Sequence, residues 1–475
     1  MCTLILAGCG NGTDDGDTEE PTVAVCEIAP PGERPVVALP AVTNTEEYTL
    51  VASEWGISSD GTNAIATTEG FQDALDWAEE NSIGRFIVPA GDYLIGKPGN
   101  DIYYAGIELP GNMIFEMDPG ATLTMDTNDK WNYCVIAIRN KQDVIVRGGH
   151  IIGDRDTHVY EGEEPRDPDD FPSCGIPENP SPFFGKHDEG HAICVEGKNG
   201  RILIEDMELS RVTGDGVLIV GMPDGEVDPE VGDITIRRND IHHNRRQGVS
   251  VVGGIRILIE DNDIYNIHGA SPQFGVDLEG AGRINRDIIV INNRFKENQG
   301  GDFVNTDARN VWFENNDCDQ TGLVNRQSDG PIVHWGGSDQ VVRGNNVTVT
   351  VGSCNGQWGL IGYSGNDPDR ENRGLRGDNT QPNYFENNTF NSAGIHLAKT
   401  SHFVVRDNVI TDSMILGYFI ECLRLEDNDV SRESGFTYQF RNVAGEASGN
   451  IKNGEPVEFL MSDDSPHTNA PPSVW

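Results

Sequence analysis

Two carboxylates stand two residues apart in the stretch FGVDLE, at Asp277 and Glu279. If this stretch is a β-strand, both side chains project from the same face, because successive residues of a strand alternate between faces. Their Cα atoms are then about 6.5–7 Å apart. Carboxyl groups at such a spacing can divide the roles of acid and base in cleaving a glycosidic bond. A third carboxylate, Asp215, precedes a similar strand in GDGVLIV.

Basic side chains gather in the stretch IHHNRRQG, which leads into another strand of the same kind. We single out His243, Arg245 and Arg246 as candidate catalytic residues, with Gln247 beside them. An arginine can hold a carboxylate through two parallel hydrogen bonds. The chain as a whole has 77 Asp and Glu against 34 Lys and Arg, and a net charge of -43. This acidity argues against a nucleic-acid partner, because binding phosphates requires a basic face.

A repeat explains how these strands are positioned. Short alternating apolar strands are each followed by a turn that contains asparagine, and Asn388, Asn408 and Asn428 are 20 residues apart. A unit this short has room for two or three strands but not for a crossover helix. Such units bury their apolar side chains only by stacking on one another. The repeat therefore predicts an all-β chain, a parallel β-helix of about ten coils. The recurring asparagines are Asn239, Asn262, Asn293, Asn316, Asn345, Asn388, Asn408 and Asn428.

One helix precedes the coils. In TTEGFQDALDWAEENSIG, residues 67–84, the apolar residues Phe71, Ala74, Leu75 and Ala78 recur at helical spacing. We predict four segments: a truncated lipoprotein-type signal over 1–9, a flexible acidic linker over 10–45, the β-helix domain over 46–461 and a C-terminal tail over 462–475.

The helix, the stretch FIVPAGDYLI and the asparagine-marked coils resemble the pectate-lyase superfamily over about residues 50–460. The resemblance implies a right-handed single-stranded parallel β-helix whose leading helix caps the open end. The superfamily includes pectate and alginate lyases, polygalacturonase-type hydrolases, mannuronan epimerases and phage tailspikes. Its specific motifs do not transfer: EGHAI, residues 189–193, lies too early for the Gly-His-Gly of the hydrolases, and the Asp-Pro-His of the epimerases is absent.

Aligning three strands at Gly216, Gly248 and Gly275 directs Asp277 outward, one coil from the basic cluster. Neighbouring coils are about 4.8 Å apart. Opposite charges at that distance orient one another and shift pKa values, which is typical of a functional site. The alternative is a structural ladder of ion pairs along the rod, which contributes little to stability.

Two reactions suit these residues. In a β-elimination on a uronate polymer, Arg245 or Arg246 binds the carboxylate, and His243 or the other arginine removes the proton. Asp215, Asp277 and Glu279 could then hold Ca²⁺, which requires several oxygen ligands. In a hydrolysis, Asp277 and Glu279 act as a pair with Asp215 as third partner.

We favour elimination on an acidic polysaccharide, because a neutral sugar needs no arginine pair. The alternatives are a polygalacturonase-like hydrolase and a non-catalytic glycan-binding or adhesion rod. The predicted substrate-binding residues are Gln247, His268, Gln273, Trp358 and Arg373.

The N-terminus LILAGCG resembles a bacterial lipoprotein signal, in which Cys9 would be lipidated. The apolar run is short, and no Lys or Arg precedes it. We expect an exported protein, anchored by lipid to the outer membrane or cell surface, or secreted. No apolar run is long enough for a membrane-spanning helix. Seven of the nine cysteines remain after Cys2 and Cys9, so at least one is free. The oligomeric state is left open.

Overall fold

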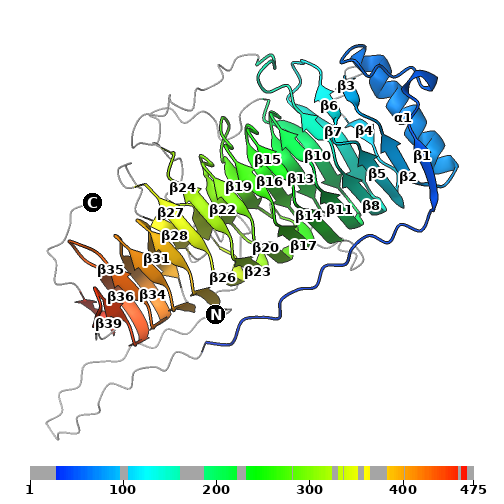
Figure 1. The fold of residues 1–475 in the computed structure, drawn as a ribbon. Helices are drawn as coiled ribbons and strands as arrows, with labels where there is room; N and C mark the ends of the chain where they lie inside the picture. Colours follow the sequence, from blue (N-terminus) through cyan, green and yellow to red (C-terminus); the bar gives the residue numbers. More distant parts are fainter. Residues whose placement is uncertain are drawn as a thin grey trace, which may run out of the picture.

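The computed structural model describes residues 28–96, 105–160, 187–221, 232–280, 282–323, 330–334, 336–350, 358–363, 382–400, 402–457 and 462–467. Their strands stack side by side into a rod, with one helix at an end (Figure 1). Apart from the pairings of β38 and β39, the strands pair in parallel. The prediction of a right-handed parallel β-helix is confirmed. No helix of the described residues is long and apolar enough to cross a membrane.

Most coils contribute one strand to each of three stacks, whereas in the last coils one long strand extends from the third stack into the first. The first stack contains β1 (Glu46–Thr49), β2 (Ile83–Val88), β5 (Met113–Met117), β8 (Gln142–Arg147), β11 (Gly200–Glu205), β14 (Gly232–Arg237), β17 (Gly254–Glu260), β20 (Asn285–Ile291), β23 (Arg309–Glu314), β26 (Ser338–Arg343), β29 (Asn383–Glu386) and β32 (Phe403–Arg406).

The second stack contains β3 (Gly91–Ile95), β6 (Ala121–Met125), β9 (His150–Ile152), β12 (Glu208–Ser210), β15 (Asp240–His242), β18 (Asp263–Tyr265), β21 (Arg294–Lys296), β24 (Asp317–Gln320), β27 (Asn346–Val349), β30 (Thr389–Asn391), β33 (Val409–Thr411), β35 (Asp429–Ser431), β37 (Ile451–Lys452) and β38 (Glu455–Pro456).

The third stack carries the candidate site. It contains β4 (Ala105–Glu108), β7 (Asn132–Arg139), β10 (Glu189–Glu196), β13 (Asp215–Val220), β16 (Gln247–Val252), β19 (Phe274–Leu278), β22 (Gly301–Asn305), β25 (Ile332–His334), β28 (Trp358–Tyr363), β31 (Gly394–Thr400), β34 (Ile415–Glu426) and β36 (Tyr438–Ser448). A strand over residues 462–467, β39 (Ser462–His467), pairs antiparallel with β36, so part of the predicted tail belongs to the sheet.

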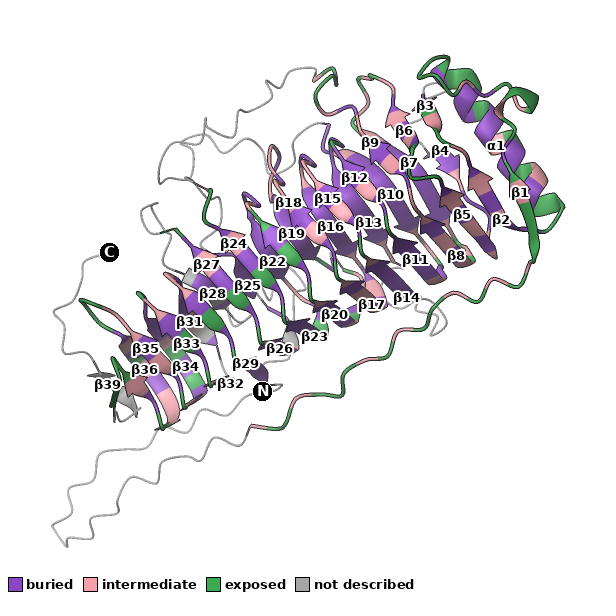
Figure 2. Ribbon diagram, viewed as in Figure 1, coloured by how far each residue is buried: buried purple, intermediate pink, exposed green. Residues whose placement is uncertain are grey.

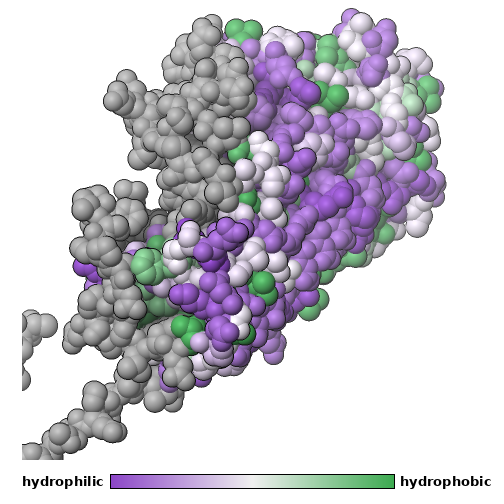
Figure 3. Space-filling model, turned by 60° about the vertical axis from the view of Figure 1, so that its left-hand side comes forward, coloured by the Kyte–Doolittle hydropathy of each residue, from purple (hydrophilic) through white to green (hydrophobic). Residues whose placement is uncertain are grey.

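The second stack has 14 strands in the described chain, of which the last, β38, only returns antiparallel to β37. About ten coils were expected from the asparagine repeat, which begins at residue 239, whereas β3, β6, β9 and β12 precede it. Inward side chains from all three stacks form one continuous apolar core along the rod. The buried residues of these strands are purple in Figure 2, whereas the face of the described residues drawn in Figure 3 is mostly hydrophilic.

The recurring asparagines form a buried ladder where the first stack turns into the second. Asn345 is a representative rung: its Nδ2 donates to Phe313 O at 3.0 Å and to Asn388 Oδ1 at 2.9 Å. Its own Oδ1 accepts from the backbone N–H of Asn316 at 2.9 Å. Each rung thus satisfies backbone groups that the turn would otherwise leave unpaired in the core. Asn450 extends the ladder by one rung beyond the predicted set.

The helix α1 (Ala64–Glu80) closes one end of the rod. Its predicted apolar residues Phe71, Ala74, Leu75 and Ala78 are fully buried. A short 3-10 helix, η1 (Ala52–Glu54), precedes it. The capping role predicted for this helix is therefore consistent with its position and its buried face.

The N-terminal segment of residues 28–45 runs along the first stack, visible as the dark blue trace beneath the rod in Figure 1. Backbone N–H groups of Ala38 and Ala41 donate to Asp233 and Asp143 at 3.0 and 2.9 Å, and that of Thr43 donates to Asn112 at 2.7 Å. Toward the other end of the rod, Tyr384 donates to the carbonyl of Ala29, and Arg34 pairs with Glu314. Residues 28–45 were predicted to belong to a flexible linker, but they are bonded to coils along most of the rod.

Candidate functional site

Outward-facing residues of β10, β13, β16 and β19 form the candidate site. The predicted alignment of the strands is confirmed: the Cα partners are Val217, Val249 and Val276, followed by Leu218, Ser250 and Asp277. The three valines belong to the core of the rod, whereas Asp277 does not. Asp277 is nevertheless only 2% exposed, while Glu279 lies just beyond the end of β19 and is exposed.

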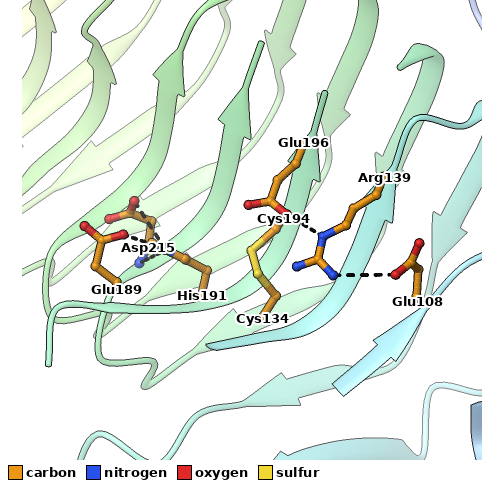
Figure 4. Close-up of a disulfide and its surroundings, with 8 residues drawn as sticks. All are labelled: Glu108, Cys134, Arg139, Glu189, His191, Cys194, Glu196 and Asp215. Carbon is orange, nitrogen blue, oxygen red and sulfur yellow. Dashed lines mark hydrogen bonds and ion pairs between the residues drawn. A yellow bond between two sulfur atoms is a disulfide. The ribbon is translucent and has the colours of Figure 1, made fainter. Parts of the chain in front are cut away.

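Arg246 and His191 both contact the carboxylate of Asp215, which is fully buried. The Nη1 atom of Arg246 lies 3.0 Å from Oδ2 of Asp215. The Nδ1 atom of His191 lies 3.4 Å from the same oxygen and accepts the backbone N–H of Asp215 at 3.0 Å. A neutral His191 ring that accepts at Nδ1 carries its proton on Nε2. That Nε2 atom is buried, has no hydrogen-bond partner and lies 4.0 Å from Glu189, as Figure 4 illustrates.

Burial raises the pKa of the Asp215 carboxyl, and the charges of Arg246 and His191 partly oppose this shift. For Arg246, burial by itself lowers the pKa, but the carboxylates of Asp215, Asp277, Asp188 and Glu189 outweigh it, so the pKa lies above its ordinary value. Arg246 is thus a fixed positive charge. Oδ1 of Asp215 is buried and has no hydrogen-bond partner in the described structure.

Gln247 lies on β16, between the strands that carry the two buried carboxyl groups. Its Cα pairs with that of Asp215, and its Nε2 donates to Oδ2 of Asp277 at 2.5 Å. Burial, and then the negative charge of Glu279, raise the pKa of Asp277 to about 8. Asp277 is therefore mostly protonated at neutral pH. Its other oxygen, Oδ1, is buried and has no hydrogen-bond partner within the described part of the chain.

The segment before β10 adds another carboxyl group, that of Asp188. Burial raises its pKa to about 6, an effect that the nearby Arg246 opposes. Gly214 permits this close approach, since a Cβ there would lie 2.7 Å from the carbonyl oxygen of Asp188 and 2.8 Å from Nδ1 of His191.

Other predicted residues lie in a second, neighbouring cluster. Arg245 donates to the carbonyl of His187 at 3.0 Å, and its guanidinium lies 4.8 Å from the centre of the Tyr160 ring. Arg155 donates to the carbonyl of His243 and contacts the ring of His268 at 2.8 Å. Arg245, His243 and His268 are thus not directed at Asp215. Burial, and then the neighbouring His242, lower the pKa of His243 to about 4.

Gln273 is buried, and its side-chain oxygen accepts the backbone N–H of Gly269 at 2.5 Å. This oxygen therefore stabilises the turn before β19. The side chain of Trp358, at the start of β28, and the whole of Arg373 lie outside the described residues. These two predicted substrate-binding residues stay predictions.

The metal prediction does not fit the donors that surround the carboxylates. Calcium requires six to eight oxygen ligands. Asp215 instead faces a guanidinium, Asp277 accepts from an amide, and Glu279 is exposed. Over the described ranges, no group of three or more His, Cys, Asp or Glu residues is placed to hold a metal ion. We derive no step through calcium.

The ion-pair ladder considered as an alternative exists, but on the first stack. Glu314, Arg343, Glu386 and Arg406 pair in series across β23, β26, β29 and β32. Their arginine side chains are about 40% exposed, whereas that of Arg246 is 11% exposed. The arginine at Asp215 is therefore more buried than the arginines of the ladder, whereas the ladder's glutamates are themselves buried, at 5% and 3% exposure.

Comparison with known proteins agrees with this architecture. The family model described as the right-handed β-helix region matches residues 185–347 and 234–433, which together span just over half of the chain.

The chain belongs to the right-handed β-helix family. It is 28% identical over 315 residues to the uncharacterized protein YclG of Bacillus subtilis (strain 168), covering 63% of this chain and 49% of YclG. It is 29% identical over 324 residues to the SPbeta prophage-derived uncharacterized protein YorA of the same organism, covering 64% of this chain and 50% of YorA. The chain thus spans about half the length of these relatives.

Similar solved structures include the A-module of Azotobacter vinelandii mannuronan C-5 epimerase AlgE6, at 13% identity and a TM-score of 0.47 over 86% of this β-helix chain and 100% of that chain. An exopolygalacturonase from Thermotoga maritima has 15% identity and a TM-score of 0.46, over 88% of this chain and 94% of that chain. The Streptococcus pneumoniae surface protein and adhesin PfbA has 13% identity and a TM-score of 0.43, over 86% and 100%.

Three residues of the site were missed in the sequence: Asp188, Glu189 and His191. The stretch EGHAI was dismissed because of its position in the chain. Pairing of Ile193 with Val217 places His191 beside Asp215. Aligning EGHAICVEG with GDGVLIVG, as the other strands were aligned, was the signal that could have found this histidine.

Proposed function

We propose that this chain cleaves glycosidic bonds in an acidic polysaccharide, at the outward face of β10, β13, β16 and β19. The observation that carries the proposal is the state of Asp277: a buried carboxyl outside the core, with a pKa raised to about 8 and one oxygen without a hydrogen-bond partner. A carboxyl that is protonated at neutral pH can donate its proton to a departing glycosidic oxygen.

The geometry favours hydrolysis over the elimination predicted from sequence. A hydrolase needs a second carboxyl that is ionised and can activate water. Asp215 is the candidate for that role, because Arg246 and His191 oppose the rise in its pKa that burial causes, and its Oδ1 has no hydrogen-bond partner among the described residues. Asp277 and Asp215 are close enough that the charge of one raises the pKa of the other. In this assignment Asp277 is the acid and Asp215 is the base.

Elimination is the second candidate, and the charge of Arg246 favours it. A fixed guanidinium can neutralise the carboxylate of a uronate and acidify the neighbouring C–H bond. The bases predicted for this reaction are less suitable, since His243 lies in the other cluster and Arg246 is paired with Asp215. Elimination would therefore have to use another base of the site, such as His191.

Export is supported by one covalent feature. Cys134 and Cys194 form a disulfide between β7 and β10, which Figure 4 draws together with its surroundings. Disulfides persist in oxidising compartments. Lipidation at Cys9 stays a proposal, because that residue lies outside the described part of the chain. Metabolic labelling with a fatty acid, in the wild type and in Cys9→Ala, tests it.

The proposal is tested with purified protein on polygalacturonate, alginate and chondroitin sulfate. New reducing ends without ultraviolet absorbance from an unsaturated uronate indicate hydrolysis. Reducing ends with that absorbance indicate elimination. Retention of a polymer without either product would identify a glycan-binding rod and contradict the enzymatic proposal.

A further inference from the structure

One tryptophan stands apart from the others in the described residues. Trp131, just before β7, is 54% exposed. Trp55 and Trp77 pack against each other with ring centres 5.9 Å apart, and Trp312 is buried. An exposed indole presents a large rigid apolar surface to water, which is unfavourable unless something covers it.

The chain segment that carries Trp131 is held in place by hydrogen bonds. The side-chain amide of Asn128 donates to the carbonyl of Asp126 at 3.0 Å and to the buried carboxylate of Asp154 at 2.9 Å. The side-chain oxygen of Asn128 accepts the backbone N–H of Lys130 at 2.9 Å. The indole is therefore attached to a fixed backbone, and a ligand that binds it loses little free energy in ordering the protein.

Trp131 also lies next to the candidate site. Its carbonyl accepts the backbone N–H of Glu189 at 3.0 Å, and the following residue, Asn132, is the Cα partner of Glu189. Glu189 and its neighbour Asp188 both lie within the electrostatic range of Arg246. The backbone that carries the indole is thus one strand, about 4.8 Å, from the backbone of Glu189 at the acidic edge of the site.

We propose that Trp131 forms a sugar-binding subsite beside the candidate active site, and that it takes a pyranose ring of the polysaccharide. One face of a pyranose exposes only C–H groups, which pack on the flat apolar surface of an indole. The inference rests on the proposed function for the identity of the ligand, but a subsite of this kind contributes binding and not chemistry. It would hold the polymer while the bond next to it is cleaved.

The test separates binding from turnover. Trp131→Ala and Trp131→Phe are compared with the wild type by affinity electrophoresis in gels containing polygalacturonate, alginate or chondroitin sulfate. For a polymer that the wild type binds, Trp131→Ala should weaken retention by about tenfold, whereas Trp131→Phe should retain most of it. If the polymer is cleaved, KM should rise in Trp131→Ala while kcat changes little. Thermal unfolding checks that both variants fold.

Phe419→Ala is the matched control, because Phe419 is 53% exposed but lies on β34, in the C-terminal coils. It should leave retention unchanged. Equal retention of the wild type and Trp131→Ala would overturn the subsite even if the polymer is cleaved. Retention that depends on Trp131 without any cleavage would support the subsite and contradict the enzymatic function. If none of the polymers retards the wild type, both the subsite and the enzymatic function are overturned.

Discussion

Gln247 donates a hydrogen bond from Nε2 to Oδ2 of Asp277 in the next coil, at 2.5 Å. An amide donor occupies this oxygen as an acceptor, so a proton on Asp277 belongs on the other oxygen, Oδ1. The carbonyl of the Gln247 side chain accepts the backbone N–H of Phe274 at 2.8 Å, which fixes the orientation of the amide. The glutamine therefore determines which oxygen of Asp277 carries the proton when the carboxyl is protonated.

Asp277→Asn should change the pH dependence of stability. The pKa of Asp277 is raised in the folded protein to about 8 from an ordinary value of 3.8. The stabilisation from the bound proton is complete below pH 3.8 and is lost as the pH rises to about 8. The Tm of Asp277→Asn minus the Tm of the wild type should therefore increase as the pH rises across this range. Above about pH 8 this difference should stay constant. Tm curves that stay parallel from pH 4 to about pH 9 would show that the carboxyl is not held protonated.

Arg246→Ala should be strongly destabilising, by about 3–5 kcal/mol, because it leaves the buried Asp215 without its cation. Combining it with Asp215→Asn should recover a large part of that loss. Urea unfolding of the wild type, both single variants and the double variant measures the coupling.

The exposed pair of Arg294 and Asp263 is the control for that cycle. The side chain of Arg294 is 72% exposed, so Arg294→Ala should change the free energy of unfolding by less than about 1 kcal/mol. A similar small effect for Arg246→Ala would contradict the buried ion pair.

Asn345→Ala should reduce the free energy of unfolding by about 1–3 kcal/mol, because it leaves the carbonyl of Phe313 and the N–H of Asn316 without partners in the core. Asn391, half-exposed on β30, bonds only to neighbouring side chains, so Asn391→Ala should change the stability by about 0.5 kcal/mol or less. Denaturant unfolding compares the two variants. Equal effects would mean that the ladder does not stabilise the rod.

The N-terminal segment should show site-specific protection in hydrogen exchange. Asp143→Ala removes the acceptor of the Ala41 N–H, so exchange at Ala41 should accelerate. The N–H of Thr43, which is bonded to Asn112, is the internal control and should keep its rate. Fast exchange at both positions in the wild type would show that residues 28–45 are not bound to the rod in solution.

The fold was predictable because the repeat determines which side chains face the core, and alternation at Gly216, Gly248 and Gly275 gives the strand register. The same rule explains why the residues predicted for the site lie in two clusters. Arg245 and Arg246 are consecutive, so they diverge at the start of a strand, one toward Tyr160 and the other toward Asp215.

The burial of Asp277 could not be predicted, since alternation gives the direction of a side chain but not what surrounds it. The partners of Asp215 come from β10 and from the residue before β16, and the pairing that brings His191 there follows from the three-dimensional register. Spacing within one strand therefore drew attention to Asp277 but linked it to Glu279, which is exposed, and not to residues of the neighbouring strands.

The proposed function depends most on Asp277 as the acid of a polysaccharide-cleaving site. Its decisive test is the release of reducing ends from polygalacturonate, alginate and chondroitin sulfate by the wild type and by Asp277→Asn, with and without EDTA. We expect the wild type to cleave one polymer, EDTA to have no effect, and Asp277→Asn to be folded but inactive. Full activity of a folded Asp277→Asn would show that Asp277 is not the acid.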